Sequence, residues 1–102
     1  MNNVLLKVSL QELCQYEGLT EQLIVEVVSH GIAEPAEGHV AADWVFDTSS
    51  VRWLQKAVRL YYDLEIDWVA VAIVIDLLQQ KEVLEERNRI IEQQLNRLLD
   101  LH

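Results

Sequence analysis

Apolar and polar positions recur at helical spacing twice in the first third of the chain. Ser9 and Glu12 form a capping box, which predicts a first helix that ends at Gly18. Thr20 can cap a second helix. The apolar face of that second helix carries Leu23, Ile24, Val27 and Val28. Because only the three residues 18–20 separate the two helices, the pattern predicts a helix-turn-helix.

A loop with short extended segments is predicted to follow the second helix. Residues 32–47 carry the turn formers Pro35 and Gly38. Residues 43–47, Asp-Trp-Val-Phe-Asp, place a valine between two aromatic residues, which predicts a short strand or hairpin. Residues 4–8 are a second β-prone segment. Short strands beside a helix-turn-helix predict a small wing.

A third helix is predicted to begin at one of three capping residues, Asp47, Thr48 or Ser49. Its inward face is predicted to carry Val51, Leu54, Val58 and either Tyr61 or Tyr62. Residues 65–67 interrupt this pattern, and Asp67 can cap a fourth helix.

The fourth helical pattern runs from Trp68 to Leu101 without Gly or Pro. Residues 69–78 are nearly all apolar, so we expect this end of the helix to be buried in the domain. After Gln79 the pattern becomes polar, with an apolar stripe at Leu84, Ile91, Leu95 and Leu98. A single exposed helix of this length is marginal in water, so we expect a short coiled coil, from about residue 80, with a second copy of the chain.

Together these elements predict a mainly α-helical fold. Residues 1–67 form a winged helix-turn-helix domain with a small β wing, and residues 68–102 form the long dimerisation helix. The chain has no apolar run long enough for a membrane span and no signal-peptide pattern at its start. Its single cysteine, Cys14, rules out an internal disulfide and fits a reducing compartment. We therefore expect a cytoplasmic protein with no membrane contact.

Charge divides the chain into two unequal parts. Residues 8–51 contain no Lys or Arg but eight acidic residues. From Arg52 onward, seven basic residues are mixed with nine acidic ones. The net charge is −9, and most of it belongs to the helix-turn-helix and wing. The first half therefore presents a surface of one sign.

This distribution argues against nucleic acid as the partner. Lys and Arg supply most of the affinity of proteins for phosphate, and base reading depends mainly on Arg, Lys, Asn and Gln. The outer face of the second helix offers instead Gln22, Val25, Glu26 and Ser29. Its acidic residues would meet phosphate with like charge, so we expect no nucleic-acid binding.

A basic protein partner suits the acidic surface better, because complementary potentials speed association and select partners. Val25 and Trp44 can supply apolar anchors. The predicted binding surface consists of Glu17, Glu21, Val25, Glu26, Asp43 and Trp44. A simpler interpretation is that the acidic residues keep a small protein soluble.

Metal binding and catalysis find little support. Cys14, His30 and His39 fit no zinc-ligand spacing, and a cysteine at a helical core position usually behaves as a small apolar residue. The chain has no phosphate-binding glycine loop, and nothing marks a nucleophile with an oxyanion site. We expect no metal, no cofactor and no enzymatic activity.

Three segments carry a resemblance to a known family. They are ELCQYEGLTEQLIVEVVSHGIAEP, WVFD and VRWLQKAVRLYYDLEIDW, which together span most of residues 9–68. In their order and spacing they resemble the MerR-type winged helix-turn-helix, and more closely the CbpM chaperone-modulator family, a MerR-like branch. DNA-binding MerR-type proteins carry a basic residue where this chain has Val25, often another at Ser29, and an arginine in the wing where it has Trp44.

The resemblance implies a non-catalytic regulator that forms an antiparallel homodimer. CbpM-like proteins bind the J-domain of the DnaJ-like co-chaperone CbpA and inhibit its co-chaperone activity. A J-domain presents a basic helix to Hsp70 (DnaK), so an acidic protein that covers this helix would block the docking of Hsp70. Two other functions remain open: a MerR-type DNA-binding transcriptional regulator, and a purely structural dimerisation module.

Overall fold

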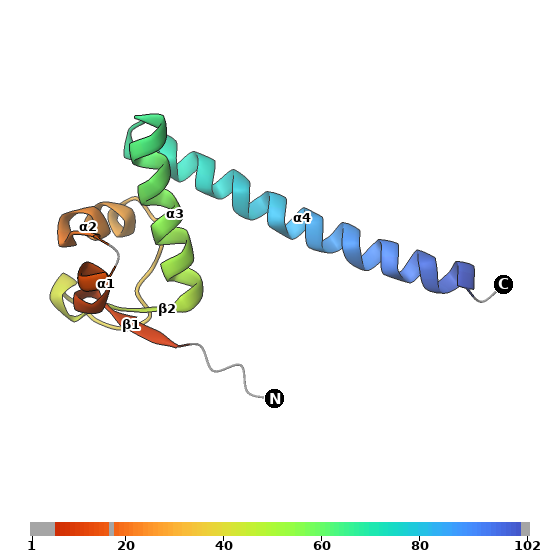
Figure 1. Ribbon diagram of the computed structural model, residues 1–102, viewed down its shortest axis with the longest axis horizontal. Coiled ribbons are helices and arrows are strands. Elements are labelled where there is room, and N and C mark those ends of the chain that lie inside the picture. Colours follow the sequence, from red (N-terminus) through yellow and green to blue (C-terminus); the bar gives the residue numbers. More distant parts are fainter. Residues whose placement is uncertain (1–5, 17, 101–102) are drawn as a thin grey trace.

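The computed structural model describes residues 6–16 and 18–100 and is mainly helical (Figure 1). In chain order its elements are β1 (Lys7–Ser9), α1 (Leu10–Tyr16), α2 (Glu21–Ser29), the 3-10 helix η1 (Ala41–Asp43), β2 (Val45–Asp47), α3 (Thr48–Leu64) and α4 (Trp68–Asp100). The predicted fold class is confirmed: four α-helices, a two-stranded antiparallel sheet and a long C-terminal helix.

The caps of the helix-turn-helix lie where the sequence predicts them, with one difference. The Thr20 hydroxyl accepts the Leu23 N–H at 3.2 Å at the start of α2. The Ser9 hydroxyl accepts the Glu12 N–H at 3.2 Å at the start of α1. The Glu12 carboxylate accepts from the Ser9 hydroxyl at 3.1 Å, whereas a capping box predicts the Ser9 backbone N–H as its donor.

The small sheet joins the start of the chain to the segment before α3. β1 and β2 pair antiparallel, with Val8 opposite Phe46. The predicted strand at residues 4–8 is thus shifted, and residues 4 and 5 lie outside the described part. An isolated bridge between Glu37 and Val45 extends the pairing into the loop after α2 and forms the wing. Gly38 turns this loop with a φ of +107°.

One core holds these elements together. Phe46 from β2 is fully buried among residues of α2, α3 and α4. The largest fully buried side chains are Phe46, Ile24, Leu54, Ile75, Val27 and Val71. Tyr61 packs against this core, whereas its neighbour Tyr62 is exposed, which decides between the two tyrosines that the pattern left open.

α4 begins against α3 and then leaves the globular part (Figure 1). The Asp67 carboxylate caps it by accepting the Ala70 N–H at 2.8 Å. The expectation that residues 69–78 are buried is right for one face only: Val71 and Ile75 are buried, but Val69, Ile73 and Leu77 are exposed. Residues 81–100 are exposed throughout. No helix in the described part is long and apolar enough to span a membrane.

Candidate protein-binding surface

The outward face of α2 is acidic and carries an apolar residue at its centre. Glu21 is exposed in the first turn, and Val25 and Glu26 are half-exposed one turn further on. The opposite face of the same helix buries Ile24 and Val27 in the core. The amphipathic pattern of α2 therefore orients Glu21, Val25 and Glu26 together toward solvent, at the place where a helix-turn-helix reads DNA.

His30 connects this face to the rest of the molecule. Its Nδ1 lies 2.8 Å from the Glu26 carbonyl oxygen, which can only accept, so Nδ1 carries the proton. The same nitrogen lies 3.6 Å from the Glu26 carboxylate. The His30 ring stacks on Trp68, with 6.4 Å between ring centroids. The end of α2 is thereby held against the start of α4.

Asp43 and Trp44 lie on a second segment, η1 and the residue that follows it. Asp43 is exposed, whereas Trp44 is half-buried and packs edge-on against Phe46, with 6.2 Å between centroids. The Trp44 carbonyl also accepts the Leu10 N–H at 3.1 Å. Much of the indole therefore serves packing, and only part of it is available to a partner.

The two groups of predicted residues belong to one end of the molecule. Both α2 and η1 pack against α1, at the end of the globular part that lies away from the tip of α4 (Figure 1). Glu17, the remaining predicted contact residue, lies outside the described residues. Because residues 8–51 contain no Lys or Arg, no cation of that segment offsets the charge of this end.

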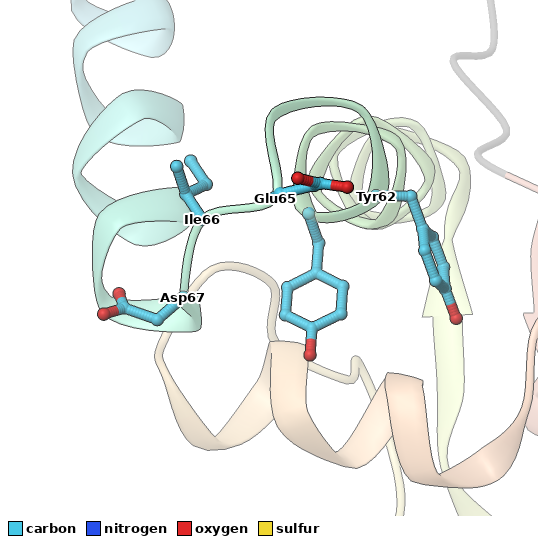
Figure 2. A pocket seen from close by; sticks show the side chains of 5 residues that line it. Tyr62, Glu65, Ile66 and Asp67 are labelled. Atoms are coloured by element: carbon cyan, nitrogen blue, oxygen red, sulfur yellow. The ribbon is translucent and has the colours of Figure 1, made fainter.

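A recess at the turn between α3 and α4 escaped the sequence analysis. It has a volume of about 400 Å³ and is lined by Tyr61, Tyr62, Glu65, Ile66 and Asp67. Figure 2 shows the Glu65 carboxylate on the side of Tyr62 and the Asp67 carboxylate on the opposite side, at the start of α4. Glu65 ends α3 in the left-handed conformation, with a φ of 52°. Such a conformation in a non-glycine residue leaves no pattern in the sequence that could have predicted the recess.

Nothing in the described residues gathers the groups that metal binding or catalysis needs. Among residues 6–16 and 18–100, no group of three or more His, Cys, Asp or Glu side chains could hold a metal ion. Cys14 is half-buried and packs against the core, and His39 is exposed. The recess at the turn between α3 and α4 brings together two carboxylates and two phenols.

The four residues predicted to dimerise lie along the exposed second half of α4. Leu84, Ile91, Leu95 and Leu98 are all more than half exposed. No contact among the described residues covers these apolar side chains. A row of exposed apolar residues along one helix often marks a site of interaction. They remain candidates for contact with another helix.

Fold and surface together define a class: a winged helix-turn-helix protein whose reading helix is acidic and whose long helix carries exposed apolar residues. Comparison with known proteins agrees. The family model for MerR HTH family regulatory proteins matches residues 8–93. Chaperone modulatory protein CbpM from Pseudomonas putida strain KT2440 is 33% identical over 100 residues, which is 98% of each chain. CbpM from Salmonella paratyphi B is 35% identical over 99 residues, 97% of each chain.

The chain therefore belongs to the MerR helix-turn-helix family and, within it, to the chaperone modulatory proteins CbpM. Membership in this group supports a role as a chaperone modulator. The group is one of regulators and not of enzymes. Resemblance in three sequence segments thus led to the correct family.

Proposed function

We propose that the protein binds the J-domain of a DnaJ-like co-chaperone of the CbpA type and inhibits its co-chaperone activity. The mechanism is competition: the acidic surface covers the basic helix that the J-domain presents to Hsp70 (DnaK). A cytoplasmic location belongs to this proposal, because the single Cys14 suits a reducing compartment.

The observation that supports the proposal most directly is the outward face of α2. Glu21, Val25 and Glu26 occupy the place of a DNA-reading surface, with no cation among them. Two carboxylates around a half-exposed valine suit a basic helix, because charge steers the encounter and the apolar centre is desolvated on contact. Asp43 and the exposed part of Trp44 extend this surface, and Glu17 is proposed as part of it.

The alternative function, DNA binding, lacks the residues that it would need. A duplex carries one negative charge for about every 1.7 Å of its axis, so Glu21 and Glu26 would be repelled by it. The basic residues of the globular part lie on β1 and α3 and not on α2. Lys7 pairs with Glu37 at 2.9 Å, Arg52 pairs with Glu82 of α4, and Lys56 and Arg59 are the other two. We therefore expect no measurable binding to duplex DNA, even at low salt.

A homodimer is also part of the proposal. Leu84, Ile91, Leu95 and Leu98 of one chain would pack against the same helix of a second chain. The second half of α4 projects away from the end of the globular part that carries α2, so pairing along it leaves the acidic surface of each chain accessible (Figure 1). Each dimer can then bind two J-domains.

Calorimetric titration of the protein with an isolated J-domain tests the proposal. We expect one J-domain per chain at low salt and weaker binding at moderate salt. A DnaK ATPase assay with the full-length co-chaperone should show that the protein suppresses the stimulation by the co-chaperone and that excess DnaK restores it. Binding without such competition would contradict the proposed mechanism, and no binding at either salt concentration would contradict the proposed partner.

Two charge-reversal double variants test whether the outward face of α2 is the binding surface. Glu21→Lys with Glu26→Lys should weaken J-domain binding by at least about tenfold, because each new lysine repels the basic helix at close range. Glu86→Lys with Asp100→Lys changes the net charge equally, on the exposed second half of α4, and should bind as the unaltered protein does. Equal loss in both variants would mean that net charge matters and this surface does not. Circular dichroism of both variants controls for folding.

A further inference from the structure

The first half of α4 carries an apolar face that nothing in the described chain covers. Val69, Ile73 and Leu77 are 61%, 58% and 59% exposed. Val71 and Ile75, two residues along from Val69 and Ile73, are buried against the core. Because successive residues of a helix turn by about 100°, positions two apart lie on nearly opposite faces. The exposed face therefore points away from the globular part that holds this helix.

This face continues into the stripe of the second half without changing direction. From Ile73 the positions 77, 80, 84, 88, 91 and 95 follow at intervals of four, three, four, four, three and four residues. Such intervals average close to one turn of a straight α-helix, so all seven residues lie on one face. With Val69 before them and Leu98 after them, the exposed stripe is about 44 Å long. The pattern predicted a coiled coil only from about residue 80, which is about two-fifths of the way along this stripe.

The positions of the stripe are spaced symmetrically about Leu84. Leu77 and Ile91 lie seven residues before and after it, and Ile73 and Leu95 lie eleven residues before and after it. The two polar members, Gln80 and Asn88, lie four residues on either side. An antiparallel copy of the helix centred on Leu84 therefore places apolar residues opposite apolar ones and the glutamine opposite the asparagine.

A shallow groove lies at the centre of this symmetry. It has a volume of about 350 Å³ and is lined by Gln79, Gln80, Val83 and Leu84. Packed helices insert each side chain of the seam into a hole between residues of the facing helix. The groove beside Leu84 is such a hole, at the point where Leu84 of a second copy would meet it.

We propose that a second copy of the chain covers the whole stripe from Val69 to Leu98, with Leu84 at the two-fold axis and Gln80 facing Asn88 of the second copy. The inference rests on the proposed homodimer and adds to it the extent and the register of the interface. The tip of each α4 then packs on Val69 and Ile73 of the other chain, on the face of α4 that its own globular part leaves uncovered.

Disulfide mapping tests the register. Gln80→Cys and Asn88→Cys are made separately in a Cys14→Ala background, and the two proteins are oxidised alone and after mixing by unfolding and refolding. We expect a covalent dimer from the mixture and none from either variant alone, because residues that face each other across the seam come within disulfide reach. Covalent dimers of Gln80→Cys alone would establish a parallel pair, and a mixture without cross-links would establish another register. Either result overturns the proposal.

The extent of the interface is tested by sedimentation equilibrium of three variants. Ile73→Glu places a charge in the first half of the stripe, Ile91→Glu places one in the second half, and Gln93→Glu places one on the opposite face as the control. We expect the dimer dissociation constant to rise by more than about a hundredfold for both isoleucine variants and to stay within about twofold for the control. An unchanged constant for Ile73→Glu would confine the interface to the second half of α4 and overturn the proposal.

These measurements need no J-domain, so their outcome is independent of the proposed partner. A protein that dimerises in the expected register but ignores the J-domain would refute the proposed function and leave this inference standing. A monomeric protein that binds a J-domain would refute this inference and leave the proposed J-domain binding standing.

Discussion

Two glycines with positive φ have different surroundings, although both occur at turns. A Cβ on Gly38, where φ is +107°, would lie 2.5 Å from the Asp43 carbonyl oxygen and 3.0 Å from the Trp44 Cα. A Cβ on Gly18, where φ is +63°, would meet nothing within 4 Å. Gly38 is therefore required by a close approach of two backbone segments, whereas Gly18 is required only by its conformation.

We expect Gly38→Ala to lower the free energy of unfolding by at least about 2 kcal/mol more than Gly18→Ala. Both variants place an L-residue at positive φ, but only the first forces the loop after α2 away from η1. Urea unfolding followed by tryptophan fluorescence, at one protein concentration, measures the difference. Equal losses would mean that the contact between Gly38 and Asp43 yields at little cost.

Asp47 connects the stability of α3 to pH. Its carboxylate accepts the Ser50 N–H at 2.8 Å and the Ser49 hydroxyl at 2.9 Å, and these bonds lower the pKa of Asp47 below its ordinary value. A lowered pKa in the folded state stabilises the fold above the unfolded-state pKa, and this stabilisation is lost as the pH falls through the folded-state pKa.

Asp47→Ala should accordingly cost about 1 kcal/mol at neutral pH, as the loss of a helix cap usually does. The difference from the unaltered protein should begin to shrink as the pH falls below about 4, where the unfolded chain protonates. Thermal unfolding between neutral and acidic pH measures it. Thr48→Ala, one residue further on, is the control and should cost little at any pH. A difference that stays constant down to acidic pH would assign the effect to packing.

In its first half, α4 packs one face against its own globular part and leaves the opposite face exposed. The sequence predicted the helix, its cap at Asp67 and its apolar first half, because these depend on local patterns. It did not predict that only one side of residues 69–78 is covered, because an all-apolar segment carries no period from which a face can be read. The sequence also did not predict that β1 pairs with β2, because contacts between residues distant in sequence leave no local pattern.

Substitutions at two isoleucines can distinguish the buried face of α4 from its exposed face. Ile75 is 2% exposed and Ile73 is 58% exposed, so the same substitution meets different surroundings two residues apart. Ile75→Ala should lower the free energy of unfolding of the globular part by about 2–4 kcal/mol, through lost burial and a cavity. Ile73→Ala should lower it by less than about 1 kcal/mol when measured at a concentration where the protein is monomeric. A reversed order would show that the globular part packs on the other face.

At the scale of the whole molecule, charge and apolar surface are segregated. The acidic residues of α2 and η1 lie at one end, and the apolar stripe runs along a helix that projects from the other (Figure 1). The sequence predicted an acidic surface through its run without Lys or Arg, because charged side chains stay at the surface when a chain folds. It could not predict that Trp44 would be shared between the core and this surface, since that depends on how η1 packs against Phe46.

This separation leads to a kinetic prediction. Exposed charges act on a partner over about one Debye length, which shrinks from about 14 Å to about 4 Å between 50 and 500 mM salt. We therefore expect the association rate constant with an isolated J-domain to fall by about tenfold or more over this range, while the dissociation rate constant changes far less. Stopped-flow fluorescence measures both constants. The variant with Glu21→Lys and Glu26→Lys should associate slowly at every salt concentration and show little dependence on salt. If salt acted instead on dissociation in the unaltered protein, the carboxylates of α2 would hold the complex through short-range ion pairs, and steering of the encounter by the acidic end would be refuted.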